Sequence, residues 1–234
     1  IGDRKQVIEL AKGLIFQLAA LYSYDEVKMI FLYNQKEKDD FQFVKWLPHT
    51  FSNDKKFRFI ATNLEEVKEI SYYLDTEIMN RIQMNDSEKE EILPYYVIFA
   101  LDKDLALKSE MLNQIYSKKK NLNISVINFV KDLQELPKEC SAVVEVHEKE
   151  AKIYDKNDIS GNYIPFKPDI YLTADPNKLS KKLANIPLNT LESGFKLPNM
   201  INFLQMFQVG KIEHLNVINR WEENDPTKRL ATPI

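Results

Sequence analysis

The residue best placed to take part in chemistry is Asp102, which directly follows a run of seven apolar or aromatic residues at 95–101. Because Pro94 precedes the run and polar residues follow it, the pattern predicts a strand buried on both faces of a parallel sheet. Ligands of such proteins gather at the carboxyl ends of the strands, so this carboxylate is placed to hold the magnesium ion of a nucleotide through water. The alternative is that Asp102 only caps the helix that follows it.

Lys103, the next residue, argues against nucleotide hydrolysis. A nucleoside triphosphatase of this kind would carry a glutamate there to orient the attacking water. The lysine is able to pair with Asp102 or Asp104 and so to fill the space that a phosphate would occupy. We therefore favour the interpretation of Asp102 as a helix cap and expect no catalytic residue here.

Residues 1–12 lack the features of a phosphate-binding loop. Such a loop needs glycines whose backbone amides wrap the phosphates, a lysine for the terminal phosphates, and a serine or threonine hydroxyl for magnesium. The segment has one glycine, Gly2, and no serine or threonine, and Lys5 has no hydroxyl residue beside it. The strand that precedes such a loop would barely begin at Ile1. We expect no bound cofactor.

Composition narrows the class of protein without naming a function. The chain has 234 residues, of which 44% are hydrophobic and 29% charged, as expected for one main globular domain. Its formal charge of -3 gives no reason to expect nucleic acid as a partner. Cys140 is the single cysteine, so an internal disulfide is excluded, and the three histidines have no metal-ligand spacing. No stretch is long and apolar enough for a membrane span. We interpret the chain as a soluble piece of a longer protein.

The apolar periodicity predicts an alternation of helices and strands. Helices are expected at 7–21, within 39–53, at 63–82 and at 105–118, and strands at 27–33, 57–61, 95–101, 123–130, 142–147 and 151–154, the last two as a hairpin. This order predicts an α/β fold with a mostly parallel sheet and helices on both of its faces.

The last third of the chain has a different texture, because prolines divide it into short pieces. Helices are predicted at 176–185 and 200–207. We therefore expect a main domain at 1–160 and an extension at 161–234 that leads to a neighbouring domain.

Three residues are candidates for an interface. Arg220 and Trp221 lie in a polar segment with little local core to join, and Trp46 is surrounded by phenylalanines in the sequence. For each tryptophan the alternative is that it belongs to a packed core.

Several short strings resemble the motor domains of the FtsK/SpoIIIE family, which are ring-forming translocating ATPases. They are Leu14-Ile15, Leu18-Ala19, Tyr24-Asp25-Glu26-Val27, Trp46-Leu47-Pro48-His49, the pair Glu77 and Arg81, and the stretch from Pro94 to Asp102. The end of the chain is similar to the membrane-anchored ATPases of type VII secretion, the EssC/EccC family, in the strings FLQMF (203–207), VGKIEHLN (209–216), Arg220-Trp221 and LATPI (230–234).

The resemblance implies a three-layer, RecA-like P-loop NTPase fold with a degenerate nucleotide site. It aligns the lysine of the phosphate loop with Val7 and makes Asp102 a vestigial Walker B-like position. It also implies the membrane-proximal domain of a secretion ATPase, at the cytoplasmic face of the membrane, which couples the membrane segment to the motors without being an enzyme itself.

The partners implied by the resemblance are the adjacent ATPase domains of the same polypeptide, other membrane subunits of the secretion system, and further copies of the protein, but not nucleic acid. Two other functions stay open. One is a weak ATP-binding or ATP-hydrolysing domain completed by residues or subunits outside this chain. The other is a DNA-translocating module, which the net charge disfavours.

Overall fold

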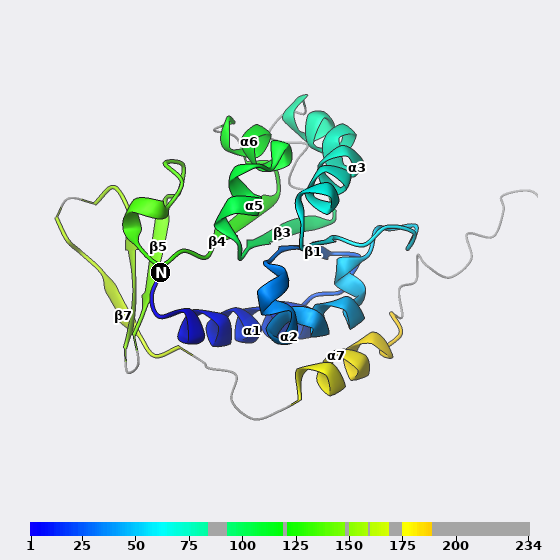
Figure 1. Cartoon of the computed structure of the whole chain (residues 1–234), viewed down its shortest axis with the longest axis horizontal. Coiled ribbons are helices and arrows are strands. Elements are labelled where there is room, and N and C mark those ends of the chain that lie inside the picture. The colour runs from blue at the N-terminus through cyan, green and yellow to red at the C-terminus, as the bar shows by residue number, and fades with distance from the viewer. Residues whose placement is uncertain (84–92, 119–120, 148–149, 159, 169–174, 189–234) are drawn as a thin grey trace, which may run out of the picture. The chain divides into compact units, whose positions relative to one another are not determined.

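A parallel four-stranded sheet forms the centre of the fold in a computed structural model, which describes residues 1–83, 93–118, 121–147, 150–158, 160–168 and 175–188 (Figure 1). The strands are β1 (Val27–Leu32), β2 (Ile60–Ala61), β3 (Tyr95–Ala100) and β4 (Ile124–Asn128), in the order β2-β1-β3-β4. All of the pairings are parallel. The predicted α/β fold with a parallel sheet is confirmed.

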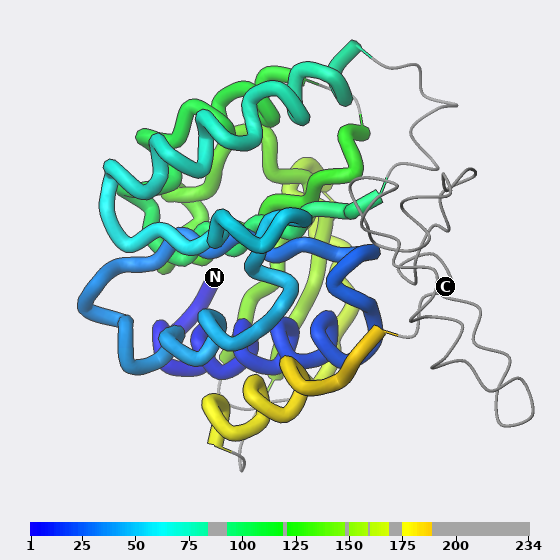
Figure 2. The backbone as a smooth tube through the Cα atoms, turned by 90° about the vertical axis from the view of Figure 1, so that its right-hand side faces the viewer, coloured from blue at the N-terminus to red at the C-terminus, as the bar shows by residue number. Residues whose placement is uncertain are grey.

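Helices cover both faces of this sheet. α1 (Arg4–Leu21) and α2 (Lys38–Phe41) pack on one face, and α3 (Leu64–Gln83), α5 (Lys103–Leu107) and α6 (Glu110–Tyr116) lie on the other (Figures 1 and 2). The continuous apolar runs of β1 and β3 follow from this arrangement, because each strand buries side chains on both sides.

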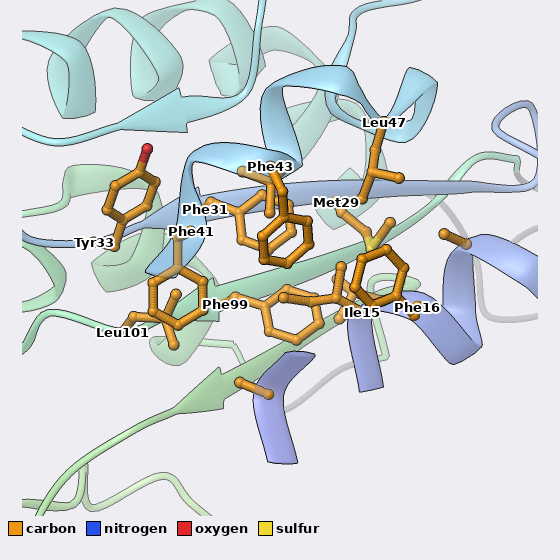
Figure 3. Packing of buried hydrophobic residues seen from close by; sticks show 14 of the residues in the cluster. Ile15, Phe16, Met29, Phe31, Tyr33, Phe41, Phe43, Leu47, Phe99 and Leu101 are labelled. Carbon is orange, nitrogen blue, oxygen red and sulfur yellow. The ribbon is translucent and has the colours of Figure 1, made fainter. Parts of the chain in front are cut away.

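Alternate residues of β1 belong to two separate cores. Phe31 joins the core under α1, whereas Ile30 joins the core under α3 and α6. The first core is aromatic: Phe31 stacks on Phe99 with ring centroids 5.0 Å apart, and Phe16 stacks on Phe43 at the same distance (Figure 3). Such stacking contributes to stability beyond the apolar area that it buries.

The boundaries of several predicted elements differ in the structure. The helix predicted at 105–118 is two helices, because the Ser109 side chain accepts a hydrogen bond from the Leu112 amide and begins α6 as a new helix. The strand predicted at 57–61 is reduced to the two residues of β2. Around the predicted helix within 39–53, α2 continues into the 3-10 turns η2 (Gln42–Trp46) and η3 (Pro48–Thr50).

The predicted hairpin forms part of a second sheet. β5 (Ala142–Val146) and β6 (Ala151–Asp155) pair antiparallel, and β7 (Ile164–Phe166) adds to β6. The predicted helix 176–185 is α7 (Pro176–Ala184), whose Leu179 and Leu183 pack against the first core and which lies along η2. The predicted helix 200–207 lies outside the described residues, and the boundary at 160/161 stays a prediction.

Arg81 is a buried cation that ties three elements together. Its side chain is 1% exposed, and its guanidinium donates to the carbonyls of Pro94 (2.8 Å), Leu122 (3.1 Å) and Asn123 (3.2 Å), at the beginnings of β3 and β4. It also pairs with Glu77 one turn earlier on α3, at 2.7 Å. The buried guanidinium therefore has the Glu77 carboxylate as its counter-ion and three backbone carbonyls as further acceptors.

Replacing Arg81 by methionine is expected to lower the free energy of unfolding by about 3 kcal/mol, because three backbone carbonyls at the beginnings of β3 and β4 lose their donor. Glu77→Gln is the matched control, since that side chain is 39% exposed and its loss should cost less than about 1 kcal/mol. Urea unfolding at neutral pH measures both. Equal losses in the two variants would contradict this role of Arg81.

His49 is a buried histidine in η3 whose ring is hydrogen-bonded to the backbone. Its Nε2 lies 2.9 Å from the Tyr22 carbonyl, to which it donates, and the residue is 3% exposed. Burial lowers the pKa of this imidazole below its ordinary value. The unfolded chain therefore takes up a proton at a higher pH than the folded protein does.

Stability is accordingly expected to fall as the pH drops below about 6.5, the pKa of an unfolded histidine, by at most about 1.4 kcal/mol per pH unit from this group. His49→Gln keeps a donor for the Tyr22 carbonyl and should remove this part of the slope. Urea unfolding of both proteins between pH 7 and pH 5 tests the expectation. Parallel pH profiles would refute it.

Candidate functional site

The carboxyl ends of β3 and β4 meet the beginning of α1, and Arg4 spans the junction. Its Nη2 donates to the carbonyl of Leu101, directly after β3, at 2.7 Å. Its Nη1 lies 3.5 Å from the carbonyl of Phe129, directly after β4. This is the edge of the sheet where a parallel α/β protein binds ligands.

Glu37 completes the environment of this guanidinium. Nε and Nη2 of Arg4 donate to its two carboxylate oxygens at 2.6 and 2.5 Å, which is a bidentate pair. Glu37 ends the turn η1 (Gln35–Glu37), which Asn34 caps two residues after the end of β1. The Arg4 and Glu37 side chains are 40% and 20% exposed. One ion pair therefore links the ends of three strands to the first turn of α1.

The amino end of α1 is occupied by the chain's own carboxylate. Asp3 is the N-cap, and its Oδ1 accepts a hydrogen bond from the Lys5 amide at 3.0 Å. Helix N-termini attract anions, and in a phosphate-binding loop the phosphate takes this place. In this chain the Asp3 carboxylate takes that place.

Asp102 uses both carboxylate oxygens within the protein. Oδ1 accepts from the Leu105 amide at 2.8 Å and so caps α5, and Oδ2 accepts from the Asn34 amide group at 3.1 Å. The side chain thus connects the segments that follow β1 and β3. Its role as a metal ligand has no support in these contacts.

The pairing expected for Lys103 is wrong. Its Nζ bonds to Glu135 at 3.1 Å, and not to Asp102 or Asp104, because the turn η4 (Leu133–Glu135) after β4 brings the Glu135 carboxylate beside α5. The hydrogen bond from Lys103 holds the pKa of Glu135 below its ordinary value. Lys103 therefore points toward η4 and does not fill a phosphate position.

The position aligned with a phosphate-loop lysine is part of the core. Val7 is 3% exposed and packs in the first core, so its side chain is not available to a ligand. Lys12 is engaged with Glu9 (3.0 Å) and Asp40 (2.9 Å), and Lys5 is exposed at the first turn. Arg4 is thus the cation of this helix that reaches the strand ends among the residues described.

Trp46 lies at the surface, and two lysine side chains contact its ring. Lys45 Nζ and Lys181 Nζ lie 5.0 and 4.5 Å from its ring centroid, the second from α7, and the residue is 39% exposed. Part of its surface therefore serves contacts within the chain. Its role as an interface residue stays a prediction, and Arg220 and Trp221 lie outside the described residues.

The carboxylates of this region are used within the protein: Glu37 pairs with Arg4, Asp3 caps α1 and Asp102 binds Asn34. A triphosphate placed here would meet like charges, and the donors of Arg4 are already engaged. Sequence reasoning found Asp102 but missed Arg4, Glu37 and Asn34. The only local signal was Asn34, a good cap residue directly after a strand.

None of the helices in the part of the chain that the structure describes is both long and apolar enough to cross a membrane. No protein-family model matches the chain. Matches are nevertheless found among curated proteins and solved structures, as follows.

The type VII secretion system protein EssC of Staphylococcus aureus (strain NCTC 8325 / PS 47) is 24% identical over 241 residues, and the ESX secretion system protein EccC of Geobacillus thermodenitrificans is 21% identical over 235 residues. Each match covers 100% of this chain and 16% of the relative. The chain therefore spans about a sixth of the length of these relatives.

The fold is similar to a solved structure of EssC from Geobacillus thermodenitrificans that contains ATPases 2 and 3. The TM-score is 0.55 at 13% identity, with 75% of this chain and 41% of that chain covered. The expected P-loop NTPase architecture is thereby confirmed. Over its whole length, the chain is homologous to the EssC and EccC proteins of type VII secretion.

Proposed function

We propose that this chain is a noncatalytic structural and coupling domain of a type VII secretion ATPase. It stands at the cytoplasmic face of the membrane, between the membrane segment and the motor domains of the same polypeptide. The homology to EssC and EccC supports the assignment to secretion. The ion pair of Arg4 and Glu37 supports the noncatalytic role, and it is the observation on which the proposal rests.

The ion pair matters because of where it lies. In an active P-loop domain, donors at the beginning of the first helix and at the strand ends remain available for phosphate and metal. Here Arg4 binds Glu37 and the Leu101 carbonyl, and Asp102 binds Asn34 and the Leu105 amide. The groups that would serve a nucleotide instead connect β1, β3, β4 and α1 to one another.

A rigid junction suits a coupling element, because force or movement applied to one strand end is shared with the others. The proposed partners are the adjacent ATPase domains of the polypeptide, other membrane subunits of the secretion system, and further copies in an oligomer. Neither nucleic acid nor a cofactor is required for this role.

The chain is expected to show no saturable binding of Mg-ATP by titration calorimetry up to about 1 mM nucleotide, which corresponds to less than about 4 kcal/mol of binding free energy. A double variant, Asp3→Asn with Glu37→Gln, lowers the negative charge and frees Arg4, and it should gain weak affinity relative to the parent. Micromolar binding of Mg-ATP to the parent would overturn the proposal in favour of a nucleotide-binding domain.

A double-mutant cycle tests whether Arg4 serves the fold. Arg4→Met and Glu37→Gln should each lower the free energy of unfolding by about 1 kcal/mol or less, because both side chains are partly exposed, and the cycle should give a coupling of about 0.5 kcal/mol. Urea unfolding of the four proteins measures it. Strictly additive losses would mean that the ion pair does not hold the strand ends together.

A further inference from the structure

Helix α7 presents three lysines on the side that faces away from the domain. Its Leu179 and Leu183 pack against the first core. Lys178, Lys181 and Lys182 are exposed, and the helical period places them on the opposite side of the helix from the two leucines. The sequence of α7 contains no acidic residue, so no carboxylate within this helix compensates the three positive charges.

Trp46 of η2 adds an aromatic ring to these lysines. The Nζ atoms of Lys181 and Lys45 lie over the ring, 4.5 and 5.0 Å from its centroid. The tryptophan is 39% exposed, so part of the indole remains open to the surroundings. We name the group of Lys45, Trp46, Lys178, Lys181 and Lys182 the basic surface.

The opposite side of the domain is acidic. α3 packs on the other face of the central sheet, and its sequence contains five acidic and two basic residues. Of the two basic residues, Arg81 is buried, whereas the carboxylates of Glu65, Glu69 and Asp75 are on exposed residues. α3 and α7 lie on opposite sides of the sheet in both views (Figures 1 and 2). Positive and negative charge are therefore separated across the domain.

This separation of charge would orient the domain at a negatively charged surface. Anionic lipid headgroups attract lysines that come within a Debye length of them, and they repel carboxylates. Tryptophan favours the boundary between headgroups and water, because its ring is apolar and its N–H is polar. A nucleobase would instead need the face of the Trp46 ring, over which two ammonium groups already lie. The basic surface therefore fits a lipid surface better than a nucleic acid.

We propose that the basic surface docks the domain on anionic phospholipid headgroups, with α3 turned away from the membrane. The inference rests on the proposed function, which places the domain beside a membrane, and it adds which side of the domain contacts the lipid. The leucines of α7 stay packed on the first core, so the helix lies on the headgroups and does not insert into the bilayer. Because the attraction is electrostatic, added salt should weaken it.

Co-sedimentation of the chain with lipid vesicles tests the proposal. Vesicles of phosphatidylcholine with about one third phosphatidylglycerol should bind the chain about tenfold more tightly than vesicles of phosphatidylcholine alone, because each lysine near an anionic surface adds to the attraction. Replacing Lys178, Lys181 and Lys182 together by glutamine should lower the partition coefficient on the anionic vesicles by about tenfold or more.

A second triple variant is the matched control. It replaces Lys68, Lys108 and Lys118 by glutamine, three lysines that are also exposed but lie on α3 and at the ends of α5 and α6. The net charge changes by the same amount, yet binding to the anionic vesicles should change little. Equal losses in the two triple variants would mean that only the net charge matters, and they would overturn the proposal.

Tryptophan fluorescence reports which side of the domain contacts the lipid. The chain has two tryptophans, so Trp221→Phe leaves Trp46 as the single reporter. Its emission should move to shorter wavelength with the anionic vesicles and stay unchanged with phosphatidylcholine alone. Unchanged emission from protein that is bound to the anionic vesicles would contradict the proposed orientation.

The remaining outcomes are also decisive. Equal binding to both kinds of vesicle would overturn the proposal, and so would binding of RNA or polyglutamate as tight as binding of the anionic vesicles, since either would assign the basic surface to another class of partner. If the α7 triple variant fails to fold, Lys178→Gln with Lys182→Gln replaces it and leaves the contact of Lys181 with Trp46 in place. Absence of lipid binding would refute this inference alone, whereas the titration with Mg-ATP decides the noncatalytic role.

Discussion

The arrangement of the strand ends depends on the hydrogen bonds that the Arg4 guanidinium donates. A guanidinium offers five donors in a fixed plane, and here they reach two strand ends and a carboxylate at once. β1 and β3 are buried on both faces, so their registers are fixed by packing, but their ends are polar and need partners. Arg4, Asn34 and Asp102 supply these partners from within the chain.

A bound nucleotide and these internal hydrogen bonds would need the same side chains and backbone groups. An open phosphate site leaves backbone amides and cations without partners until the ligand arrives, which costs stability in its absence. In this chain, side chains of the protein itself provide the hydrogen-bond partners at the strand ends. In the proposed noncatalytic role these internal contacts take the place of a ligand, and the two apolar cores of the fold do not depend on one.

The central strands were predictable from sequence because β1 and β3 read as unbroken apolar runs, and α1 and α3 because their apolar residues keep to one face. The break at Ser109 was missed, since a helix cap within an apolar pattern competes with continuation of the helix. The partner of Arg4 lies 33 residues away, and that of Lys103 lies 32 residues away. Pairings of this kind are decided by how turns after different strands come together, which no local pattern specifies.

The attachment of α7 determines how the domain would respond to being pulled. The helix is held through Leu179, Leu183 and the contact of Lys181 with Trp46, and therefore by side chains, whereas the strands of the central sheet are joined by ladders of backbone hydrogen bonds. Tension applied to the chain after α7 would therefore detach this helix before it disturbed the sheet. In the proposed coupling role, α7 would therefore detach before the central sheet and its aromatic core are disturbed.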